Sequence, residues 1–588
     1  MIASNTITLF CLLILFLPLV AFVINIFIGK RLPREGDWVS VGAILITLLL
    51  SLILLISMFI NGDPNFSHEA VLPWIDLGAF KIDLGIWVDN ITVVMLVVVA
   101  LISSMTHLFS IEYMKGDIRY NRYYAYLGLF TFSMNGIVLA NNLMSLYIFW
   151  ELVGVSSYLL IGHWFEKHSA ADASKKAFLT NRVGDIGFFI GIMLMFTAIN
   201  SFNFQDLFDG VNQGLMTGNL LTLAGIALFM GAVGKSSQFP LHIWLPDAME
   251  GPTPVSALMH AATMVAAGVY LTVRLFPLFS PEALTVIAYV GGFTALFAAT
   301  IAITQNDIKK VLAYSTVSQL GYMILAVGVG NYVAAFFHLL THAMFKACLF
   351  YGSGSVIHAM HHSLHEIHDD DTDPQDMRNM GGLWKLIPVT YLVMWIGSLA
   401  LAGIWPFSGF YSKDIVLESA WGADTAVGYY AFWMGIAAAF LTAFYSWRLL
   451  IMTFHGESRA DEVTLAHVHE SPAVMVLPLV FLSIGSLFAG FLTFDYFIGE
   501  NTATFWGNSI LILDVHPALK NAQHSPLWVV LLPSVAAIAG ITLAYIMYIL
   551  APELPSALAN GFQRTYRFLL KKWYFDELYN LIFVEPIK

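Results

Sequence analysis

Long apolar stretches separated by short polar connections run through the whole chain. Runs of about 20 apolar residues, the length of helix that crosses a bilayer, predict fourteen to fifteen membrane-spanning helices. The connections leave no space for a soluble domain, so we expect an all-α polytopic membrane protein built as one helical domain. The predicted spans are 7–29, 39–61, 86–109, 123–140, 143–165, 177–200, 220–239, 254–276, 283–304, 308–328, 331–357, 386–405, 429–453, 472–498 and 527–550, with a weaker apolar piece at 409–420.

Composition supports a membrane protein. Of the 588 residues, 58% are hydrophobic and only 11% charged, whereas a soluble domain carries about 25% charged residues. The net charge of −12 and the lack of a basic tract argue against nucleic acid as a partner. The two cysteines, Cys11 and Cys348, lie in apolar runs, which argues against a disulfide framework or a zinc site. The first run, Ile7 to Ile28, follows no basic segment, so we expect a membrane span and not a cleaved signal peptide.

Basic residues gather in alternate connections, whereas 62–84 and 200–218 are acidic or neutral. Positively charged loops stay on the inner side of a membrane. The alternation therefore predicts that the N-terminus lies outside and residues 551–588 lie inside. The basic connections contain Lys30, Arg31, Arg34, Lys115, Arg119, Arg122, Lys167, Lys175, Lys176, Lys309, Lys310, Arg564, Arg567, Lys571 and Lys572.

Four charged residues lie within or beside apolar segments: Glu151 in "LYIFWELVGVSSYLL", Asp185 in "NRVGDIGFFIGIM", Lys235 in "ALFMGAVGKSSQFP" and Lys413 in "WPFSGFYSKDIVLES". One such residue at mid-membrane costs ~3 kcal/mol, and residues of this kind commonly mark ion pathways. A helix-end anchor or a structural ion pair is the alternative interpretation for each of them.

The segment 338–350, "HLLTHAMFKACLF", places His338, His342 and Lys346 four residues apart. On a helix these side chains share one face and span about 12 Å of its axis. Histidine titrates near neutral pH and can pass a proton through either ring nitrogen. Together with the other buried charges, this stripe indicates a proton relay; interhelical hydrogen bonds with a snorkelling lysine are the alternative.

Prolines and glycines interrupt two apolar segments, each beside a buried lysine. Pro240, Pro246, Pro252 and Pro254 follow Lys235, and Pro406 and Gly409 precede Lys413. Interrupted helices are tolerated at membrane depth where they line a cavity, and two of them suggest an internal repeat of the transporter kind. A simple turn between ordinary helices is the alternative.

Two further motifs carry no site. "GKSS" at 234–237 lacks the earlier glycine of a phosphate loop, because position 229 is Phe. The tract "HAMHHSLHEIHDDDTDPQD" could bind a divalent metal, but a solvated loop between the eleventh and twelfth spans explains it, so we expect no metal. His338 and His342 point to one side of a helix and cannot sandwich one haem iron. The histidines of the tract are His358, His361, His362, His365 and His368.

Three motifs, "WLPDAMEGPTPVSALMHAATMVAAGVY", "IKKVLAYSTVSQLGYM" and "HLLTHAMFKACLF", resemble the antiporter-type subunits of respiratory complex I. Those subunits share ancestry with the large subunits of multisubunit (Mrp-type) sodium/proton antiporters. The resemblance is strong over about residues 85–455. "WVDNITVVMLVVVALISSMTHLFSIEYMKGD" and "KKWYFDELYNLIFVEPIK" are similar to the distal, L-type (chain 5) members.

The resemblance implies two inverted five-helix repeats at 123–276 and 283–453, each with one discontinuous helix. Transmembrane helices at 1–122 and 454–550 flank them, and a lateral amphipathic helix begins in 551–588. L-type subunits continue past that helix into a final membrane anchor, so either a truncated chain or a short, unanchored lateral element is expected. Site residues follow by position: Glu151 and Lys235 as the charged pair of the first half-channel, Asp185 and Arg182 near the fifth and sixth helices, His260, His338, His342 and Lys346 as the central relay, and Lys413 in the second half-channel.

The resemblance also implies a proton-translocating subunit of an NADH- or ferredoxin-driven quinone reductase in a bacterial or organellar inner membrane. No cofactor is expected in this chain; NADH, FMN, iron–sulfur clusters and quinone are expected on partner subunits. Its partners would be the other membrane-arm subunits, above all the neighbouring antiporter-like ones, and membrane lipids. An Mrp-type antiporter subunit is one alternative, although such subunits normally carry more helices after the shared core. A structural subunit is another, although it would not need Glu151, Lys235 and Lys413 in the bilayer.

Overall fold

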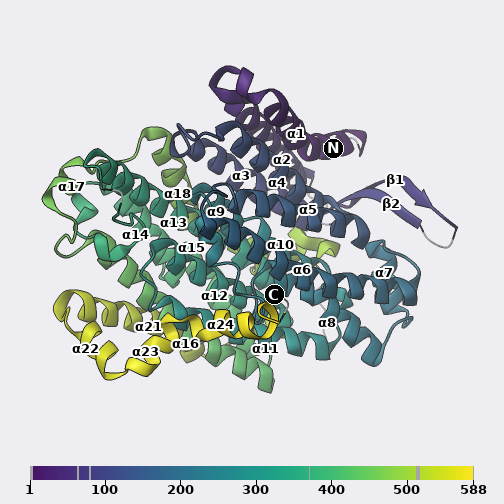
Figure 1. The fold of residues 1–588 in the computed structure, drawn as a ribbon. Helices are drawn as coiled ribbons and strands as arrows, with labels where there is room; N and C mark the ends of the chain where they lie inside the picture. The colour runs from purple at the N-terminus through teal and green to yellow at the C-terminus, as the bar shows by residue number, and fades with distance from the viewer. Residues whose placement is uncertain (1–3, 62–64, 79–80, 370, 511–516, 587–588) are drawn as a thin grey trace.

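The computed structural model describes residues 4–61, 65–78, 81–369, 371–510 and 517–586. Helices make up most of this chain and pack side by side in one bundle (Figure 1). Within the described residues, thirteen helices are long and apolar enough to cross a membrane. Two more predicted spans are helical but fall outside that group: α4 (Tyr120–Leu139), which carries polar residues along its length, and the shorter α14 (Pro388–Ala402). The prediction of a polytopic helical membrane fold is confirmed.

The other helices of the bundle follow the predicted spans closely. Their bounds are α1 (Ser4–Ile28), α2 (Asp37–Asn61), α3 (Asn90–Tyr113), α5 (Leu143–Ile161), α6 (His168–Ile199), α8 (Gly218–Lys235), α9 (Thr253–Ala261), α10 (Met264–Arg274), α11 (Pro281–Ala302), α12 (Ile308–Gly328), α13 (Tyr332–Glu366), α15 (Ser408–Gly422), α16 (Ala426–Phe454), α18 (Ala473–Phe497) and α21 (Leu527–Tyr545). Shorter helices lie in the connections: α7 (Phe204–Asn212), α17 (Glu462–His467), α19 (Thr502–Trp506) and α20 (Ala518–Ala522).

Both predicted interruptions are present. α8 ends at Lys235, and the proline-rich residues 236–252 contain only a short 3₁₀ turn before α9 begins. α14 ends at Ala402. The next residue, Gly403, has a φ of 79°, in the left-handed region that glycine tolerates, and Pro406 follows before α15. The predicted span 254–276 is present as Thr253–Arg274, and it is itself interrupted, because α9 and α10 are separate helices with Thr263 out of helical geometry between them. That 123–276 and 283–453 are inverted repeats stays a prediction.

A β-hairpin occupies the segment that was expected to be a loop at 62–84 and the start of the third span. Strands β1 (His68–Asp76) and β2 (Lys81–Val88) pair antiparallel. Ile82, Ile86 and Val88 are buried while most of their neighbours are more exposed. This two-residue alternation is the signal of a half-buried strand, and it was missed among the long apolar runs.

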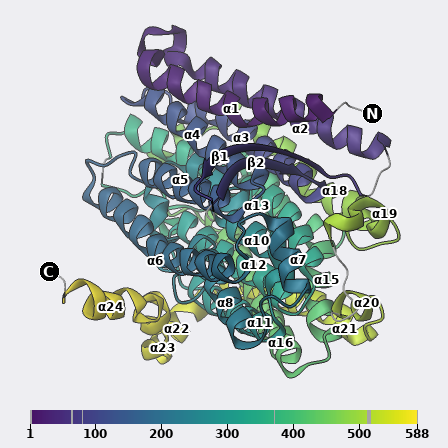
Figure 2. The same ribbon diagram turned by 90° about the vertical axis from the view of Figure 1, so that its right-hand side faces the viewer.

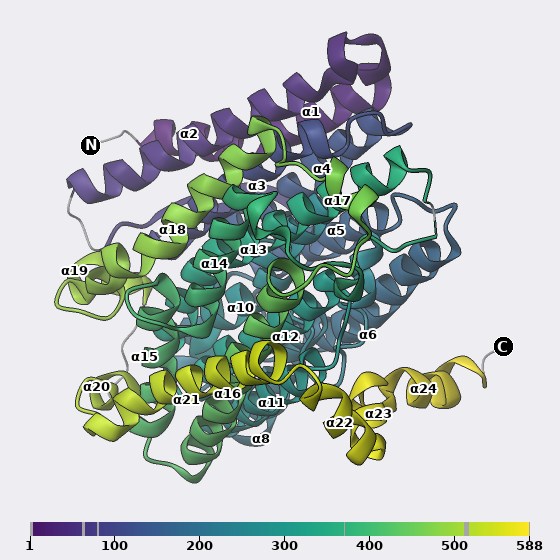
Figure 3. The ribbon, with the colours of Figure 1, turned by 90° about the vertical axis from the view of Figure 1, so that its left-hand side faces the viewer.

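The two ends of the bundle are distinct (Figures 2 and 3). The N-terminus, α19 and α20 lie at one end, whereas the α1–α2 connection and the C-terminus lie at the other. We call the latter the basic end, because the α1–α2 connection contains Lys30, Arg31 and Arg34. Which side of the membrane it faces stays a prediction.

The C-terminal segment is not one continuous helix. It forms α22 (Leu554–Gly561), α23 (Gln563–Leu570) and α24 (Phe575–Tyr579), and Lys572, Trp573 and Tyr574 between the last two have positive φ. The final residues 587–588 of this predicted element lie outside the described chain, as do 62–64 and 79–80 of the predicted loop and Asp370 of the acidic run.

Candidate functional site

Most of the predicted site residues are buried in the centre of the bundle. Lys235, His260, His338, His342 and Lys346 are 0% exposed, Lys413 is 1% and Asp185 is 2% exposed. Glu151 and Arg182 are partly exposed, with side chains at 21% and 38%. The structure therefore places seven ionisable groups in the protein interior, where each charge needs a partner or a path to water.

Lys235 is the last residue of α8 and pairs with Asp185 near the middle of α6. Its Nζ lies 3.7 Å from Asp185 Oδ2, and both side chains are almost fully buried. Trp150 of α5 donates its indole N–H to Asp185 Oδ1 at 2.7 Å and so fixes the carboxylate. The absence of a side chain at Gly154 leaves room for the ammonium group, since a Cβ there would lie 2.8 Å from Lys235 Nζ. The pair is thus held between three helices.

Glu151 forms its ion pair with Arg182, and within the described residues Lys235 is paired with Asp185; that Glu151 and Lys235 act together in the first half-channel stays a prediction. The reason for this pairing lies in helix geometry. Neighbouring residues on a helix point about 100° apart, so Trp150 faces the interior of the bundle while Glu151 lies on the partly exposed side of α5. Arg182 is one turn before Asp185 on α6 and meets Glu151 there. Two ion pairs therefore lie side by side, one interior and one partly exposed.

His260 lies at the end of α9, beside the break that precedes α10. Neither ring nitrogen has a hydrogen-bond partner among the described residues. The ring packs against Phe350 of α13, with centroids 4.7 Å apart. The hydroxyl of Ser256, one turn earlier on α9, likewise has no partner within the part of the chain that the structure describes. Buried polar atoms of this kind are normally satisfied by ordered water, so this region is suited to a hydrated path.

Lys346 and His342 occupy the middle of α13. Lys346 Nζ donates to Ser315 Oγ of α12 at 2.9 Å, and the Tyr445 hydroxyl of α16 bonds the same oxygen at 2.9 Å. Both His342 nitrogens lack a partner in the part of the chain that the structure describes. Among the described residues, Lys346 is thus hydrogen-bonded, whereas the His342 ring keeps its hydrogen-bonding capacity unused.

His338 links α13 to α15. Its Nε2 lies 3.0 Å from Gln319 Oε1, to which it can donate, and its Nδ1 lies 2.9 Å from Ser412 Oγ, with which it can exchange a hydrogen bond. Ser412 also contacts Thr341 Oγ1 at 2.6 Å. Lys413 is the next residue along α15, and its Nζ lies 5.1 Å from the centre of the Tyr322 ring. The stripe of His338, His342 and Lys346 is therefore linked to Ser412, the residue next to Lys413.

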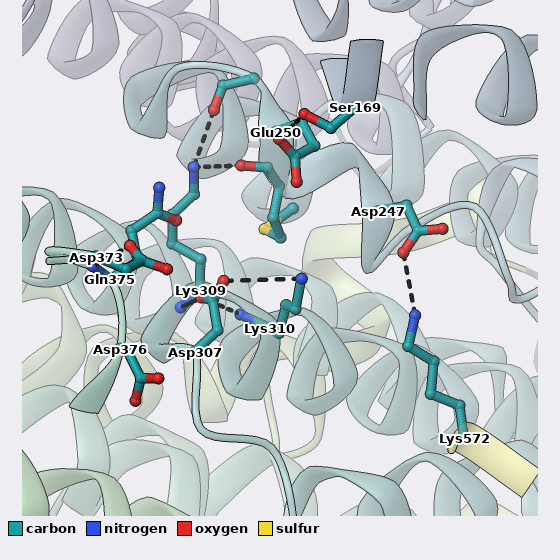
Figure 4. A network of polar contacts seen from close by, with 12 residues as sticks. Ser169, Asp247, Glu250, Asp307, Lys309, Lys310, Asp373, Gln375, Asp376 and Lys572 are labelled. Carbon is teal, nitrogen blue, oxygen red and sulfur yellow. Dashed lines mark hydrogen bonds and ion pairs between the residues drawn. The ribbon is translucent and has the colours of Figure 1, made fainter. Parts of the chain in front are cut away.

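Sequence reasoning missed the hydroxyl and amide groups that connect the ionisable residues, namely Ser315, Gln319, Ser412 and Tyr445. It also treated Lys309 as a loop residue. Lys309 is 2% exposed, and its Nζ donates to the carbonyl of Met249 and, at 2.9 Å, to that of Gly251 (Figure 4). These carbonyls end the 3₁₀ turn between α8 and α9, so Lys309 fastens the connection between Lys235 and His260.

The C-terminal segment packs on the same connection. Lys572 Nζ lies 3.1 Å from Asp247 Oδ1 and 3.1 Å from Asp576 Oδ2, and Lys176 of α6 pairs with both carboxylates. Burial alone would raise the pKa of Asp576, but Lys572 and Lys176 hold that pKa below its ordinary value. Burial would lower the pKa of Lys572, but Asp247 and Asp576 raise it. We call these four residues the C-terminal clamp.

The histidine tract is helical, and the prediction that it lies wholly in a loop is wrong. α13 continues to Glu366, so His358, His361, His362 and His365 stand on its last two turns at the basic end. Alanine, methionine and leucine between the histidines allow the helix to continue. In the described chain, no group of three or more His, Cys, Asp or Glu side chains is arranged to hold a metal ion.

Two family models match this chain. The model described as "NADH:quinone oxidoreductase/Mrp antiporter, TM" covers residues 140–442, and that of "NADH-Ubiquinone oxidoreductase (complex I), chain 5 N-terminus" covers 74–124. NADH-quinone oxidoreductase subunit L of Rhodobacter capsulatus is 41% identical over 98% of this chain and 90% of its own. NADH-ubiquinone oxidoreductase chain 5 of Triticum aestivum is 43% identical over 97% and 85%.

Solved structures share the fold. A chain of the Mrp complex from Dietzia sp. DQ12-45-1b superposes with a TM-score of 0.76 at 26% identity, over 93% of this chain and 57% of that one. A chain of the membrane-bound sulfane sulfur reductase, an archaeal respiratory membrane complex, superposes with a TM-score of 0.72 over 87% of this chain and 99% of that one. At 21% identity, the second likeness concerns the fold alone.

Proposed function

Since this chain belongs to the subunit L (chain 5) family of NADH:quinone oxidoreductase, we propose that its line of buried side chains is the route by which it moves protons. The chain is a proton-translocating subunit of the membrane arm and works as part of an enzyme complex, with the other complex I subunits as its partners. It is a multi-pass protein of an energy-transducing membrane. The route, its orientation and its driving step are the proposal.

One observation carries the proposal: buried nitrogens of ionisable side chains on α8, α9, α13 and α15 have open hydrogen-bonding capacity. Lys235, His260, His342 and Lys413 all have at least one buried nitrogen without a hydrogen-bond partner in the described residues. A structural network would satisfy such atoms, because an unsatisfied buried polar group costs about 1–3 kcal/mol. A proton path needs free lone pairs and donors through which water can connect successive groups.

In the first half-channel, Lys235 holds the proton and Asp185 controls it. A nearby carboxylate favours the protonated lysine, and its withdrawal favours release. Arg182 keeps Glu151 paired beside them, so a change in that outer pair alters the field at Lys235. Protons then pass from Lys235 towards His260.

In the centre, His260, His342, Lys346 and His338 carry the proton along the bundle. Imidazole accepts at one nitrogen and donates from the other, which suits the Ser412–His338–Gln319 arrangement. Lys413 receives the proton beside Ser412 and passes it into the second half-channel.

The energy comes from quinone reduction on partner subunits, which hold the NADH, FMN, iron–sulfur and quinone sites. Moving one charge against 100 mV requires ~2.3 kcal/mol, and a shift of one pKa unit supplies ~1.4 kcal/mol. Small rearrangements of buried ion pairs are therefore sufficient. We place the N-terminus outside and the C-terminal segment, with the basic end, inside.

Cation/proton antiport is the second candidate, supported by the likeness to the Mrp complex chain. Sodium dependence separates the two candidates. Proton transport that continues unchanged in sodium-free medium supports the first.

The relay is tested by Lys346→Met in the reconstituted complex, with Lys571→Met, an exposed lysine, as the control. Methionine keeps the length and apolar body of lysine but cannot carry a proton. We expect electron transfer to continue while protons pumped per electron fall. A normal pumping ratio in the Lys346→Met complex overturns the relay.

A further inference from the structure

We propose that the histidines at the end of α13 collect protons at the basic end of the bundle and deliver them to His260. The proposal rests on the proposed function, because it supplies the relay described above. The histidine cluster consists of His358, His361, His362, His365 and His469. The geometric basis is the position of this cluster at the start of a chain of hydroxyl groups that leads inward.

The cluster combines exposed and buried members. His361, His362 and His365 lie on one face of α13 and are exposed, whereas His358, one turn deeper, is half-buried. His469, in the loop after α17, has its ring 5.2 Å from that of His362. Protons captured at the surface can therefore pass between neighbouring imidazoles towards His358.

Carboxylates and one lysine surround the cluster. Glu112 of α3 lies within electrostatic range of His358 and pairs with Lys115 at 3.0 Å. Glu366 of α13 lies 4.0 Å from His362. Glu470 caps α14 by accepting from Val389 N and Thr390 N. Negative charge beside histidine favours proton capture, and histidine exchanges protons near neutral pH.

A hydroxyl contact continues the route inward. The His358 ring lies 6.3 Å from the Tyr113 ring of α3, and the Tyr113 hydroxyl bonds Thr253 Oγ1 at 2.7 Å. Thr253 begins α9, and Ser256 and His260 follow at three and seven residues, which places all three on one face of that helix. Seven residues span about 10.5 Å of axis.

The atoms along this face are open to proton transfer. Ser256 Oγ and both His260 nitrogens are without a hydrogen-bond partner in the described chain. A cluster imidazolium gives up one proton and becomes neutral. Each hydroxyl or water on the way receives one proton and passes one on, so it is unchanged. His260 gains the proton and becomes the imidazolium that feeds the relay.

A collecting surface is needed when protons are scarce. At about pH 8 the proton concentration is only about 10⁻⁸ M, so the rate at which free protons meet one uptake site falls tenfold for each further pH unit. Typical enzyme turnover is about 1–10³ per second. A single uptake site therefore limits a fast pump in alkaline medium, and several coupled histidines relieve that limit.

The test compares pumping by the reconstituted complex at two pH values. The cluster variant carries His361→Gln, His362→Gln, His365→Gln and His469→Gln. The control variant carries His168→Gln and His524→Gln, two exposed histidines outside the cluster. At about pH 6.5, near the ordinary value for histidine, both variants should pump normally. At about pH 8.5, about two units above the ordinary value for histidine, only the cluster variant should slow several-fold, and added imidazole buffer on the basic side should restore it.

Normal pumping by the cluster variant in alkaline medium overturns the proposal, as does a loss at both pH values that imidazole does not rescue. Tyr113→Phe and Thr253→Val remove the hydroxyls and keep the shapes, and they should slow pumping at both pH values without rescue. Unchanged pumping in both variants rules out this route. Failure of the relay itself gives a different result, because the pumping ratio of the Lys346→Met complex should not depend on pH or on added imidazole buffer.

Discussion

Asp185 is the carboxylate that reaches Lys235: its Oδ2 lies 3.7 Å from Nζ, and Trp150 holds its other oxygen at 2.7 Å. Asp185→Asn keeps the shape and the indole contact but removes the charge. We expect this variant to lose most proton pumping while electron transfer continues, because Lys235 then has no counter-charge. Loss of only ~1.4 kcal/mol of attraction between Asp185 and protonated Lys235 lowers the proton-binding constant of the lysine about tenfold. Protons pumped per electron in the reconstituted complex provide the measurement.

Glu151→Gln should act through Arg182. The substitution leaves a guanidinium without its partner beside the Lys235–Asp185 pair, which disfavours a protonated lysine. We therefore expect reduced pumping that the added change Arg182→Gln partly restores. A double-mutant cycle of pumping ratios measures this coupling. Strictly additive losses would show that the two residues act separately.

Lys235→Arg should fail almost as fully as Lys235→Ala. Arginine keeps the positive charge near Asp185 but does not release a proton in this range. The quantity to measure is again the pumping ratio, with assembly of the complex checked on native gels. A Lys235→Arg complex that pumps normally would show that Lys235 supplies charge and carries no proton.

Ser412→Ala should interrupt the contact between the relay and Lys413, because Ser412 Oγ is the group that His338 Nδ1 contacts at 2.9 Å. Ser412→Thr keeps a hydroxyl and should retain more pumping. Ser419→Ala is the matched control, since Ser419 is buried on the same helix and bonds Ile415 O and Asn331. Equal effects of Ser412→Ala and Ser419→Ala would contradict a specific role for Ser412.

Lys309→Met should lower the stability of the complex. The change leaves the Met249 and Gly251 carbonyls unpaired in the interior, at about 1–3 kcal/mol for each unsatisfied group. Lys310→Met serves as the control, because Lys310 is more exposed and lies 4.0 Å from its partner Asp307. Thermal unfolding in mild detergent should show a lower Tm for Lys309→Met alone.

The C-terminal clamp should hold across neutral pH and weaken at both extremes. The lowered pKa of Asp576 gives a contribution that is present above its ordinary value of 3.8 and is lost as pH falls through the lower folded value. The raised pKa of Lys572 gives a contribution that is present below 10.5 and is lost as pH rises through the higher folded value. Hydrogen exchange of residues 563–584, corrected for intrinsic rates, should show constant protection between about pH 5 and 9. Protection that changes steadily across this range would contradict the ionic clamp.

Apolar run length was sufficient to predict the bundle, because a bilayer imposes one length on every spanning helix. The hairpin was missed because its alternation is short beside runs of 20 residues. α13 extends past the predicted end at 357, because its last turns contain no helix breaker. The prediction stopped at 357 because those last turns are polar. Hydropathy marks where a helix leaves the apolar layer and carries no information on where the helix itself ends.

The site was predictable as a set of residues but not as a set of contacts. Buried charges are rare enough in apolar runs to be recognised singly. The partner of Lys235 depends on how α5, α6 and α8 are rotated about their axes, and neighbouring positions such as Trp150 and Glu151 differ by about 100°. The bridging hydroxyls, among them Ser315 and Ser412, were missed because serine is common in membrane helices and only packing shows which one faces a histidine.

The length of α13 also fixes an electrical depth for the relay. Its 35 residues extend about 52 Å at 1.5 Å per residue, well beyond a hydrocarbon core of about 30 Å. If α13 enters that core near Tyr332, His342 lies about 15 Å inside it, close to the midplane. A proton that reaches His342 from either surface has then crossed about half of the membrane potential, ~1.2 kcal/mol for each 100 mV. The voltage is thereby divided into two nearly equal steps, and a change in membrane potential acts on loading and on release of the relay alike.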